Sequence, residues 1–224
     1  AFHAYLVSAS GVNATPVISH TGTEHIGTYA EFIGYIKTST DGKKIGLCNY
    51  GLHFIELFDF DNATGQLSNP VKFVPYNNPY GIEFSPDNSK LYVLTHFDKR
   101  LLQFDLQAGD ETAVKNSETL IATIDGDKGG ALQLGPDGKI YVAKENSEYL
   151  GVINKPNNPG GNCDYDDNQI YLAGQKSRLG LPTLISSMLK GKDFTYQNTC
   201  IGETVHFSIT DDTDIKSVSW NFGD

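Results

Sequence analysis

The chain has 224 residues, of which 39% are hydrophobic and 11% aromatic, and this composition favours a folded globular protein over a disordered one. Its formal net charge of −10 disfavours nucleic-acid binding, because phosphate contacts need Lys and Arg residues, and these are outnumbered 27 to 17 by Asp and Glu. No apolar run approaches the roughly 18 residues of a membrane-spanning helix, so we expect no membrane span.

Three segments in the middle of the chain repeat one another. They are GYIKTSTDGKKIGLCNY from Gly34, YGIEFSPDNSKLYVLTH from Tyr80 and GALQLGPDGKIYVAKEN from Gly130. Each alternates apolar and polar residues, passes through an Asp-containing turn and continues as a second apolar strand, which is the pattern of a β-hairpin. Pro, Asn and Gly beside the aspartates supply turn geometry. We therefore interpret the aspartates as structural turn residues, and they are Asp41, Asp87 and Asp137.

Each repeat continues with two further strands. The third strand is read in FIELFDFD, LLQFDL and YLGVINK, and the fourth in PVKFVPY, ETLIATI and QIYLAG. Four strands in each repeat, a period near 45 residues and no predicted helix together indicate the blades of a β-propeller. A series of β-sandwiches or a solenoid is the alternative fold.

The predicted blades divide residues 1–189 in chain order. The outer half of a blade is expected at about 1–25, complete blades at 34–78, 80–125 and 130–174, and a closing innermost strand at 180–187. The fold class is therefore all-β, with a partial propeller of about three full four-stranded blades plus a half blade. We expect the chain to be a fragment whose remaining blades come from the same longer protein, before Ala1.

Residues 190–224 carry a different pattern. Val205, Phe207 and Ile209 alternate as one strand, and Val218, Trp220 and Phe222 alternate as another. The ending VSWNFGD resembles the most recognisable motif of polycystic-kidney-disease (PKD) domains, with Asn in place of the commoner acid. The resemblance implies a truncated immunoglobulin-like sandwich with Trp220 and Phe222 in its core.

The propeller repeats also resemble a known group. Ser85 to Thr95, SPDNSKLYVLT, resembles the Tyr-Val-Thr-Asn (YVTN) type repeats of lactonase-like and quinoprotein-like bacterial propellers. Such a propeller followed by a PKD domain is similar to Bacteroidetes cell-surface proteins of the gliding-motility-associated type, which use type IX secretion. The resemblance implies an extracellular, outer-membrane-associated location.

The search for catalytic and metal-binding patterns finds none of the common motifs for nucleophilic, zinc or nucleotide chemistry. The densest acidic cluster supplies oxygen donors of the kind that calcium prefers, but it lacks the spacing of a calcium loop. Its members are weak metal candidates: Asp164, Asp166, Asp167 and Asn168. We favour a solvated turn there and expect neither metal nor cofactor. Cys48, Cys163 and Cys200 allow at most one disulfide, and their state is open.

One loop is a better candidate for recognition. It leads into the innermost strand of a blade, near one mouth of the central channel, and combines aromatic rings with amides that suit a sugar or a peptide. Its residues are Tyr76, Asn77, Asn78 and Tyr80. Ordinary packing between blades is the alternative interpretation of this loop.

These observations lead to two functional hypotheses. The first is a non-catalytic, extracellular binding or adhesion scaffold for glycan or protein partners, and hence not an enzyme. The alternative is a lactonase-like hydrolase or a quinoprotein-like oxidoreductase whose catalytic residues lie largely in the missing blades. The lack of catalytic motifs favours the first hypothesis.

Overall fold

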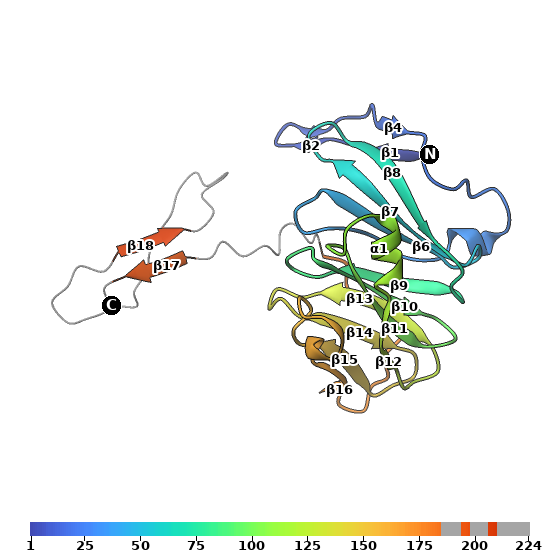
Figure 1. Cartoon of the computed structure of the whole chain (residues 1–224), viewed down its shortest axis with the longest axis vertical. Helices are drawn as coiled ribbons and strands as arrows, with labels where there is room; N and C mark the ends of the chain where they lie inside the picture. Colours follow the sequence, from blue (N-terminus) through green and yellow to red (C-terminus); the bar gives the residue numbers. More distant parts are fainter. Residues whose placement is uncertain (185–193, 198–205, 210–224) are drawn as a thin grey trace. The chain divides into compact units, whose positions relative to one another are not determined.

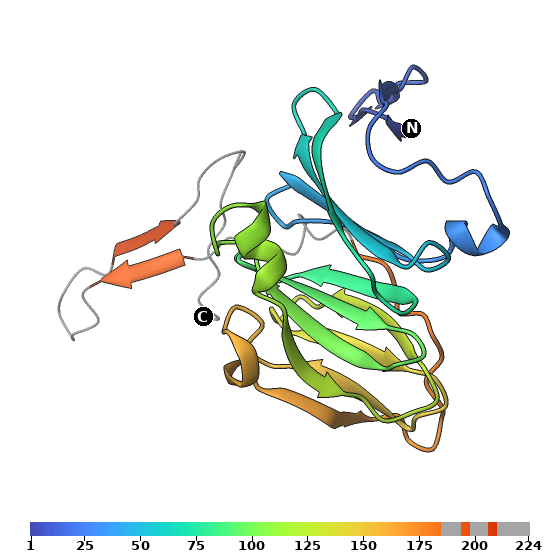
Figure 2. The same ribbon diagram turned by 45° about the vertical axis from the view of Figure 1, so that its right-hand side comes forward.

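The computed structural model describes residues 1–184, together with the backbone of 194–197 and 206–209. The chain divides into two compact units, Ala1–Leu189 and Lys190–Asp224. The first unit consists mainly of three antiparallel four-stranded sheets stacked face against face in chain order (Figures 1 and 2). This arrangement confirms the predicted all-β fold with a partial propeller.

The strands of each sheet follow one another from the innermost to the outermost position. The first blade contains β5 (Ile36–Thr38), β6 (Lys44–Asn49), β7 (Phe54–Asp61) and β8 (Gln66–Phe73). The second blade contains β9 (Pro79–Phe84), β10 (Lys90–Thr95), β11 (Arg100–Asp105) and β12 (Thr119–Thr123). The third blade contains β13 (Gly129–Leu134), β14 (Ile140–Lys144), β15 (Tyr149–Ile153) and β16 (Tyr165–Tyr171).

Four short strands precede the first blade. β1 (Phe2–Ala4) pairs with β4 (Val17–Ser19), and β2 (Val7–Ser8) pairs with β3 (Gly11–Val12). The Phe2 ring lies edge-to-face with Phe58 of the first blade, with 5.0 Å between their centres. The backbone N–H of Leu67 also donates to Ser19 Oγ at 2.9 Å. The β1–β4 pair is therefore packed against the first blade, where a half blade is expected.

The core lies between the sheets, and the middle sheet, the second blade, buries both of its faces. On β10, Leu91 and Val93 pack with the first blade, whereas Tyr92 and Leu94 pack with the third. This is the period-two alternation of a strand, with each face directed at a different neighbouring blade. Burying one such side chain stabilises the fold by roughly 1.5–3 kcal/mol.

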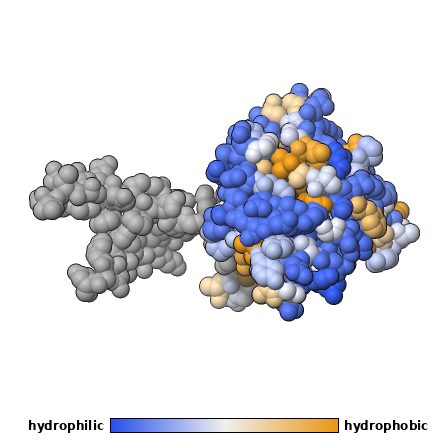
Figure 3. All heavy atoms as spheres, turned by 90° about the horizontal axis from the view of Figure 1, so that it is seen from below, coloured by the Kyte–Doolittle hydropathy of each residue, from blue (hydrophilic) through white to orange (hydrophobic). Residues whose placement is uncertain are grey.

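One blade face is left open. Ile36 of β5 is 50% exposed. The residues at the same place in the next two repeats, Ile82 and Leu132, are fully buried between blades. Tyr29 and Phe32, in the segment before β5, are also exposed. Seen from below, the surface of the first unit is mostly hydrophilic, with separate apolar patches (Figure 3). The first unit therefore presents a face of the kind that a further blade covers.

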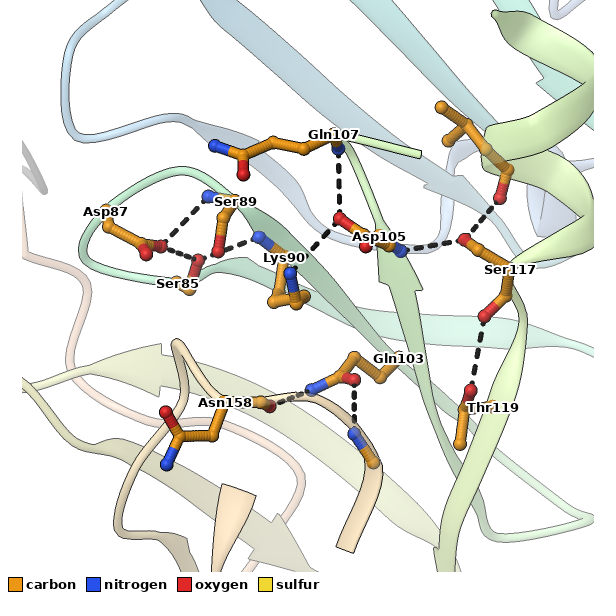
Figure 4. Close-up of polar contacts among 12 residues, drawn as sticks. Ser85, Asp87, Ser89, Lys90, Gln103, Asp105, Gln107, Ser117, Thr119 and Asn158 are labelled. Carbon is orange, nitrogen blue, oxygen red and sulfur yellow. Dashed lines mark hydrogen bonds and ion pairs between the residues drawn. The ribbon is translucent and has the colours of Figure 1, made fainter. Parts of the chain in front are cut away.

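The turn between the first two strands of each blade is held by its aspartate. In the second blade, Ser85 Oγ donates to Asp87 Oδ1 at 2.7 Å, and the backbone N–H of Ser89 donates to the same oxygen at 2.9 Å (Figure 4). Asp41 and Asp137 accept comparable local hydrogen bonds. A positive φ follows each aspartate, at Gly42, Asn88 and Gly138, and Gly and Asn adopt this conformation at little cost.

Helical segments depart from the expectation of no helix. α1 (Glu111–Asn116) connects β11 to β12, and η1 (Tyr29–Phe32) and η2 (Gly160–Cys163) are short 3₁₀ helices. The side chain of Asp110 caps α1 by accepting the N–H of Ala113 at 2.8 Å. Six residues are too few to show a helical period, so the sequence pattern could not reveal α1. Among the described residues no helix is long and apolar enough to cross a membrane.

Residues 178–184 run beside β13 without forming an assigned strand. The N–H of Ala131 donates to Leu179 O at 2.7 Å, as the N–H of Tyr35 donates to Tyr80 O at 3.0 Å between the first two blades. This segment thus takes the place of another innermost strand, and residues 185–187 of the predicted closing strand lie outside the described residues.

In the second unit, β17 (Phe194–Gln197) pairs antiparallel with β18 (His206–Ile209). Trp220 and Phe222, the predicted sandwich core, lie outside the described residues, as does Cys200.

Candidate functional site

Three polar side chains meet where the innermost strands of the three blades converge. Lys37 on β5, Glu83 on β9 and Gln133 on β13 each stand four residues before the turn aspartate of their repeat. Lys37 Nζ lies 3.1 Å from Glu83 Oε2 and donates to Gln133 Oε1 at 2.6 Å. The side chains of Lys37 and Glu83 are 5% and 0% exposed. We call these three residues the axial network.

The axial network is closed by backbone groups. Glu83 Oε1 accepts the N–H of Phe84, and Glu83 Oε2 accepts the N–H of Leu134, both at 3.0 Å. Burial raises the pKa of Glu83 above its ordinary value, although Lys37 acts in the opposite direction. Sequence reasoning missed this network, but a signal was present: each apolar innermost strand carries a polar residue at the same repeat position.

A second group of residues surrounds His96, in the loop after β10. The N–H of His96 donates to Asn78 O at 2.9 Å, and the N–H of Gly129 donates to His96 O at 2.8 Å. Asn78 directly precedes β9, and Gly129 begins β13. His96 is therefore held between the starts of two innermost strands, at one mouth of the channel.

Aromatic rings enclose the His96 imidazole. The ring centres of Tyr50, Tyr80 and Phe97 lie 5.5, 5.3 and 4.9 Å from it. We call these four residues the channel-mouth cluster. Burial lowers the pKa of His96 below its ordinary value, although its hydrogen bond to Gly129 acts in the opposite direction. Burial also raises the pKa of Tyr80, so its phenol stays neutral.

The predicted recognition loop is divided between two environments. Tyr80 belongs to the channel-mouth cluster, and Asn78 is buried beside it, with Nδ2 donating to Tyr50 O at 3.1 Å. Tyr76 and Asn77 instead bond to the side chains of Glu118 and Asp98, both at 2.7 Å. Tyr76 and Asn77 line a shallow hollow of about 500 Å³. The structure thus brings only half of the predicted loop to the channel mouth.

The acidic cluster surrounds a buried lysine. Lys144 is fully buried, and its Nζ donates to Asp125 Oδ1 at 2.5 Å and to Asn168 Oδ1 at 2.9 Å. It also bonds to the carbonyl oxygen of Asp167 and lies 3.3 Å from Asp167 Oδ1. The ammonium group of Lys144 therefore takes the oxygen atoms that a metal cation would need.

The other two members of this cluster point elsewhere. Asp164 pairs with Lys155 at 3.1 Å, and Asp166 Oδ1 accepts the N–H of Asn168 at 3.0 Å. Across the residues that the structure describes, no group of three or more His, Cys, Asp or Glu side chains is placed to hold a metal ion.

The Asn-rich loop between β15 and β16 binds the second blade. Gln103 Nε2 donates to Asn158 O at 2.8 Å, and the N–H of Gly160 donates to Gln103 Oε1 at the same distance (Figure 4). Tyr92 accepts from Gln103 Nε2 at 2.6 Å and donates to Pro156 O at 2.8 Å. The polar backbone groups of this loop thus join the second and third blades.

Two of the three cysteines lie within the described residues. Cys48 and Cys163 are buried as free thiols, and burial raises the pKa of each.

The fold defines this chain as part of a β-propeller protein. The model of the family described as "Lactonase, 7-bladed beta-propeller" matches residues 10–157. This match covers more than half of the chain, and the chain belongs to this family.

Several solved structures resemble this chain at low sequence identity. A protein from Lactobacillus plantarum is 19% identical with a TM-score of 0.53, over 78% of this chain and 50% of its own. Proposed 6-phosphogluconolactonases from Bacteroides fragilis and Bacteroides uniformis are 17% and 21% identical, with TM-scores of 0.47 and 0.46. Each match covers 75% of this chain and 51% of the other. The chain thus spans about half the length of these proteins. No curated protein matches it.

The family assignment corrects the functional expectation. The hypothesis of a non-catalytic binding or adhesion scaffold, and with it the expectation that the protein is not an enzyme, is wrong, because residues 10–157 match a lactonase family. The reason for the error is physical. The sequence search relied on short catalytic motifs, whereas a propeller can bring together residues from separate blades that no short motif contains.

Proposed function

We propose that the protein is a lactone hydrolase and that this chain supplies one side of its active site, at the channel-mouth cluster. The family match over residues 10–157 carries this proposal. Because the chain spans about half the length of the solved structures that it resembles, further blades of the same protein would complete the ring and the site.

The channel-mouth cluster suits the chemistry of a lactone. A lactone is a cyclic ester, so a site for it needs flat apolar walls for the ring and polar groups near the ester carbonyl. Tyr50, Tyr80 and Phe97 supply the walls, and His96 supplies a polar group between them. The axial network lies deeper in the channel and supports the innermost strands, since all three of its members are buried and bonded.

The test is an assay of the complete protein on sugar lactones, with glucono-δ-lactone as the first substrate and the release of acid followed at constant pH. We expect hydrolysis well above the spontaneous rate, and a large loss in a Tyr80→Ala variant. Tyr171→Ala is the matched control, because Tyr171 is exposed on the outermost strand β16. A rate equal to that of buffer alone on a panel of lactones would exclude the proposal.

We further propose that residues 190–224 begin a PKD-like sandwich and that the protein acts at the bacterial cell surface, as a gliding-motility-associated protein of type IX secretion. The motif from Val218 to Asp224 and the order of propeller and PKD-like segment support this. Protease treatment of intact cells tests the location. Cleavage of the protein is expected, and full protection within the cytoplasmic fraction would contradict it.

A further inference from the structure

We propose that His96 is the general base of the lactonase site, with its Nε2 taking a proton from the water that attacks the lactone carbonyl. This inference rests on the proposed function and assigns a catalytic residue within it. It is carried by the hydrogen bonding, the accessibility and the surroundings of one imidazole ring.

The hydrogen bond to Gly129 determines which nitrogen of His96 carries the proton. His96 Nδ1 lies 2.9 Å from the carbonyl oxygen of Gly129. A carbonyl oxygen only accepts hydrogen bonds, so Nδ1 must carry the hydrogen. In the neutral ring Nε2 then holds the free lone pair. Gly129 begins the innermost strand β13, so the ring orientation is fixed by a rigid part of the blade.

His96 Nε2 is available to a water molecule. None of the described residues forms a hydrogen bond with it. Within residues 1–184, Ser89 Oγ is the one side-chain nitrogen or oxygen atom that is both shielded from solvent and without a hydrogen bond. His96 Nε2 is therefore not sealed, although the residue as a whole is 6% exposed. A buried ring with one accessible acceptor atom is the arrangement that a general base requires.

The surroundings keep the imidazole neutral near pH 7. Burial lowers the pKa of His96, and the positive charge of Lys128 acts in the same direction. Glu145 acts in the opposite direction but is paired with Lys128 at 3.0 Å. The phenols of Tyr50 and Tyr80 also lie beside the imidazole ring. A neutral ring can accept a proton, whereas an imidazolium cannot.

The reaction step balances in atoms and charge. A water O–H bond breaks as its proton moves to His96 Nε2, and the water oxygen forms a bond to the lactone carbonyl carbon while the π pair of the C=O bond moves onto the carbonyl oxygen. The tetrahedral intermediate then collapses: the C=O bond re-forms, the bond from carbon to the ring oxygen breaks, and that oxygen takes the proton from Nε2. The product is the open hydroxy acid, and His96 returns to its neutral form.

The test compares His96→Asn with the wild type in the complete protein, on the lactone that the wild type hydrolyses fastest. Asn keeps an N–H donor near the position of Nδ1 for the carbonyl of Gly129, and it has no group that accepts a proton near pH 7. We expect kcat to fall by about 100-fold to 10,000-fold with little change in KM. The wild type should lose kcat/KM at acidic pH with an inflection below the ordinary histidine range, and His96→Asn should lose this inflection.

Two further variants complete the test. His20→Asn is the matched control, because His20 is an exposed histidine in the loop after β4, and it should keep wild-type activity. His96→Ala should recover part of its activity when imidazole is added, which a merely structural role would not allow. If the wild type hydrolyses lactones and His96→Asn keeps its rate and its pH profile, the assignment of His96 is wrong and the proposed function stands. If the wild type hydrolyses none, the proposed function itself fails.

Discussion

Replacing Lys37 with Met should destabilise the protein in a manner that depends on pH. The substitution removes the ammonium group 3.1 Å from Glu83 and leaves a fully buried carboxylate without a counter-charge. Gln133 loses its partner at the same time. Removing one member of a buried ion pair costs roughly 3–5 kcal/mol, because the other charge stays uncompensated.

The fate of Glu83 gives the magnitude and its sign. In the Lys37→Met variant, Glu83 can escape the penalty by binding a proton when the chain is folded. Protonating Glu83 at pH 7 costs at most about 3.7 kcal/mol, because pH 7 lies about 2.7 units above the ordinary glutamate pKa. Without Lys37, the folded-state pKa of Glu83 rises further above its unfolded-state pKa. The variant therefore keeps its stability below the unfolded-state pKa of Glu83 and loses it as pH rises toward the folded-state pKa. The loss amounts to about 1.4 kcal/mol per pH unit until the folded-state pKa is passed.

Urea unfolding, followed by far-ultraviolet circular dichroism from about pH 5 to about pH 8, measures how the free energy of unfolding changes with pH. The double variant Lys37→Met, Glu83→Gln is the control. It keeps an amide oxygen for the N–H of Leu134 but has no carboxyl group to titrate at position 83, so its stability should fall less steeply with pH than that of Lys37→Met. A Lys37→Met variant that stays within about 1 kcal/mol of the wild type at every pH would refute the reasoning.

Three smaller predictions follow. Lys144→Met should lower the free energy of unfolding by roughly 2 kcal/mol, measured by thermal or urea unfolding. This loss is smaller than for Lys37→Met because the acidic partners of Lys144 reach solvent. Lys176→Met, at an exposed lysine, is the control and should leave stability unchanged. Gly81→Ala should cost roughly 1–3 kcal/mol, since its new Cβ would lie 2.4 Å from a carbonyl oxygen of β13, whereas Gly161→Ala has open space and should show no such loss. Gln103→Leu should release the loop between β15 and β16, and limited proteolysis should then cut residues 156–162 faster than in the wild type, with equal rates counting against the inter-blade role of this loop.

The blades could be predicted from the sequence because their signals are local. The turn around Asp87 needs only the neighbouring Ser85 and Ser89, and the alternation on β10 is visible within six residues. Such patterns repeat with the blade period, so they reveal both the strands and their number.

The candidate site could not be predicted in the same way, because its contacts join distant blades. Lys37 and Gln133 are 96 positions apart, and their contact exists only once three innermost strands converge. The role of Lys144 likewise depends on Asp167, which belongs to a different strand of the same blade. Asparagines in loops also differ in their contacts: the backbone of Asn158 binds Gln103 of the second blade, whereas Asn78 lies beside Tyr50 at the channel mouth.

The shared repeat position of Lys37, Glu83 and Gln133 has a consequence for how such proteins diversify. In the second blade, Ile82 and Phe84 on either side of this position pack with the first blade and are fully buried. One site per blade can therefore be substituted to change the charge along the axis while the apolar faces between blades stay intact. The three described blades supply three such sites, so each blade can acquire a new polar group near the axis by a single substitution. The residues that hold the blades together and the residue that sets the polarity near the axis therefore occupy separate positions of a single repeat.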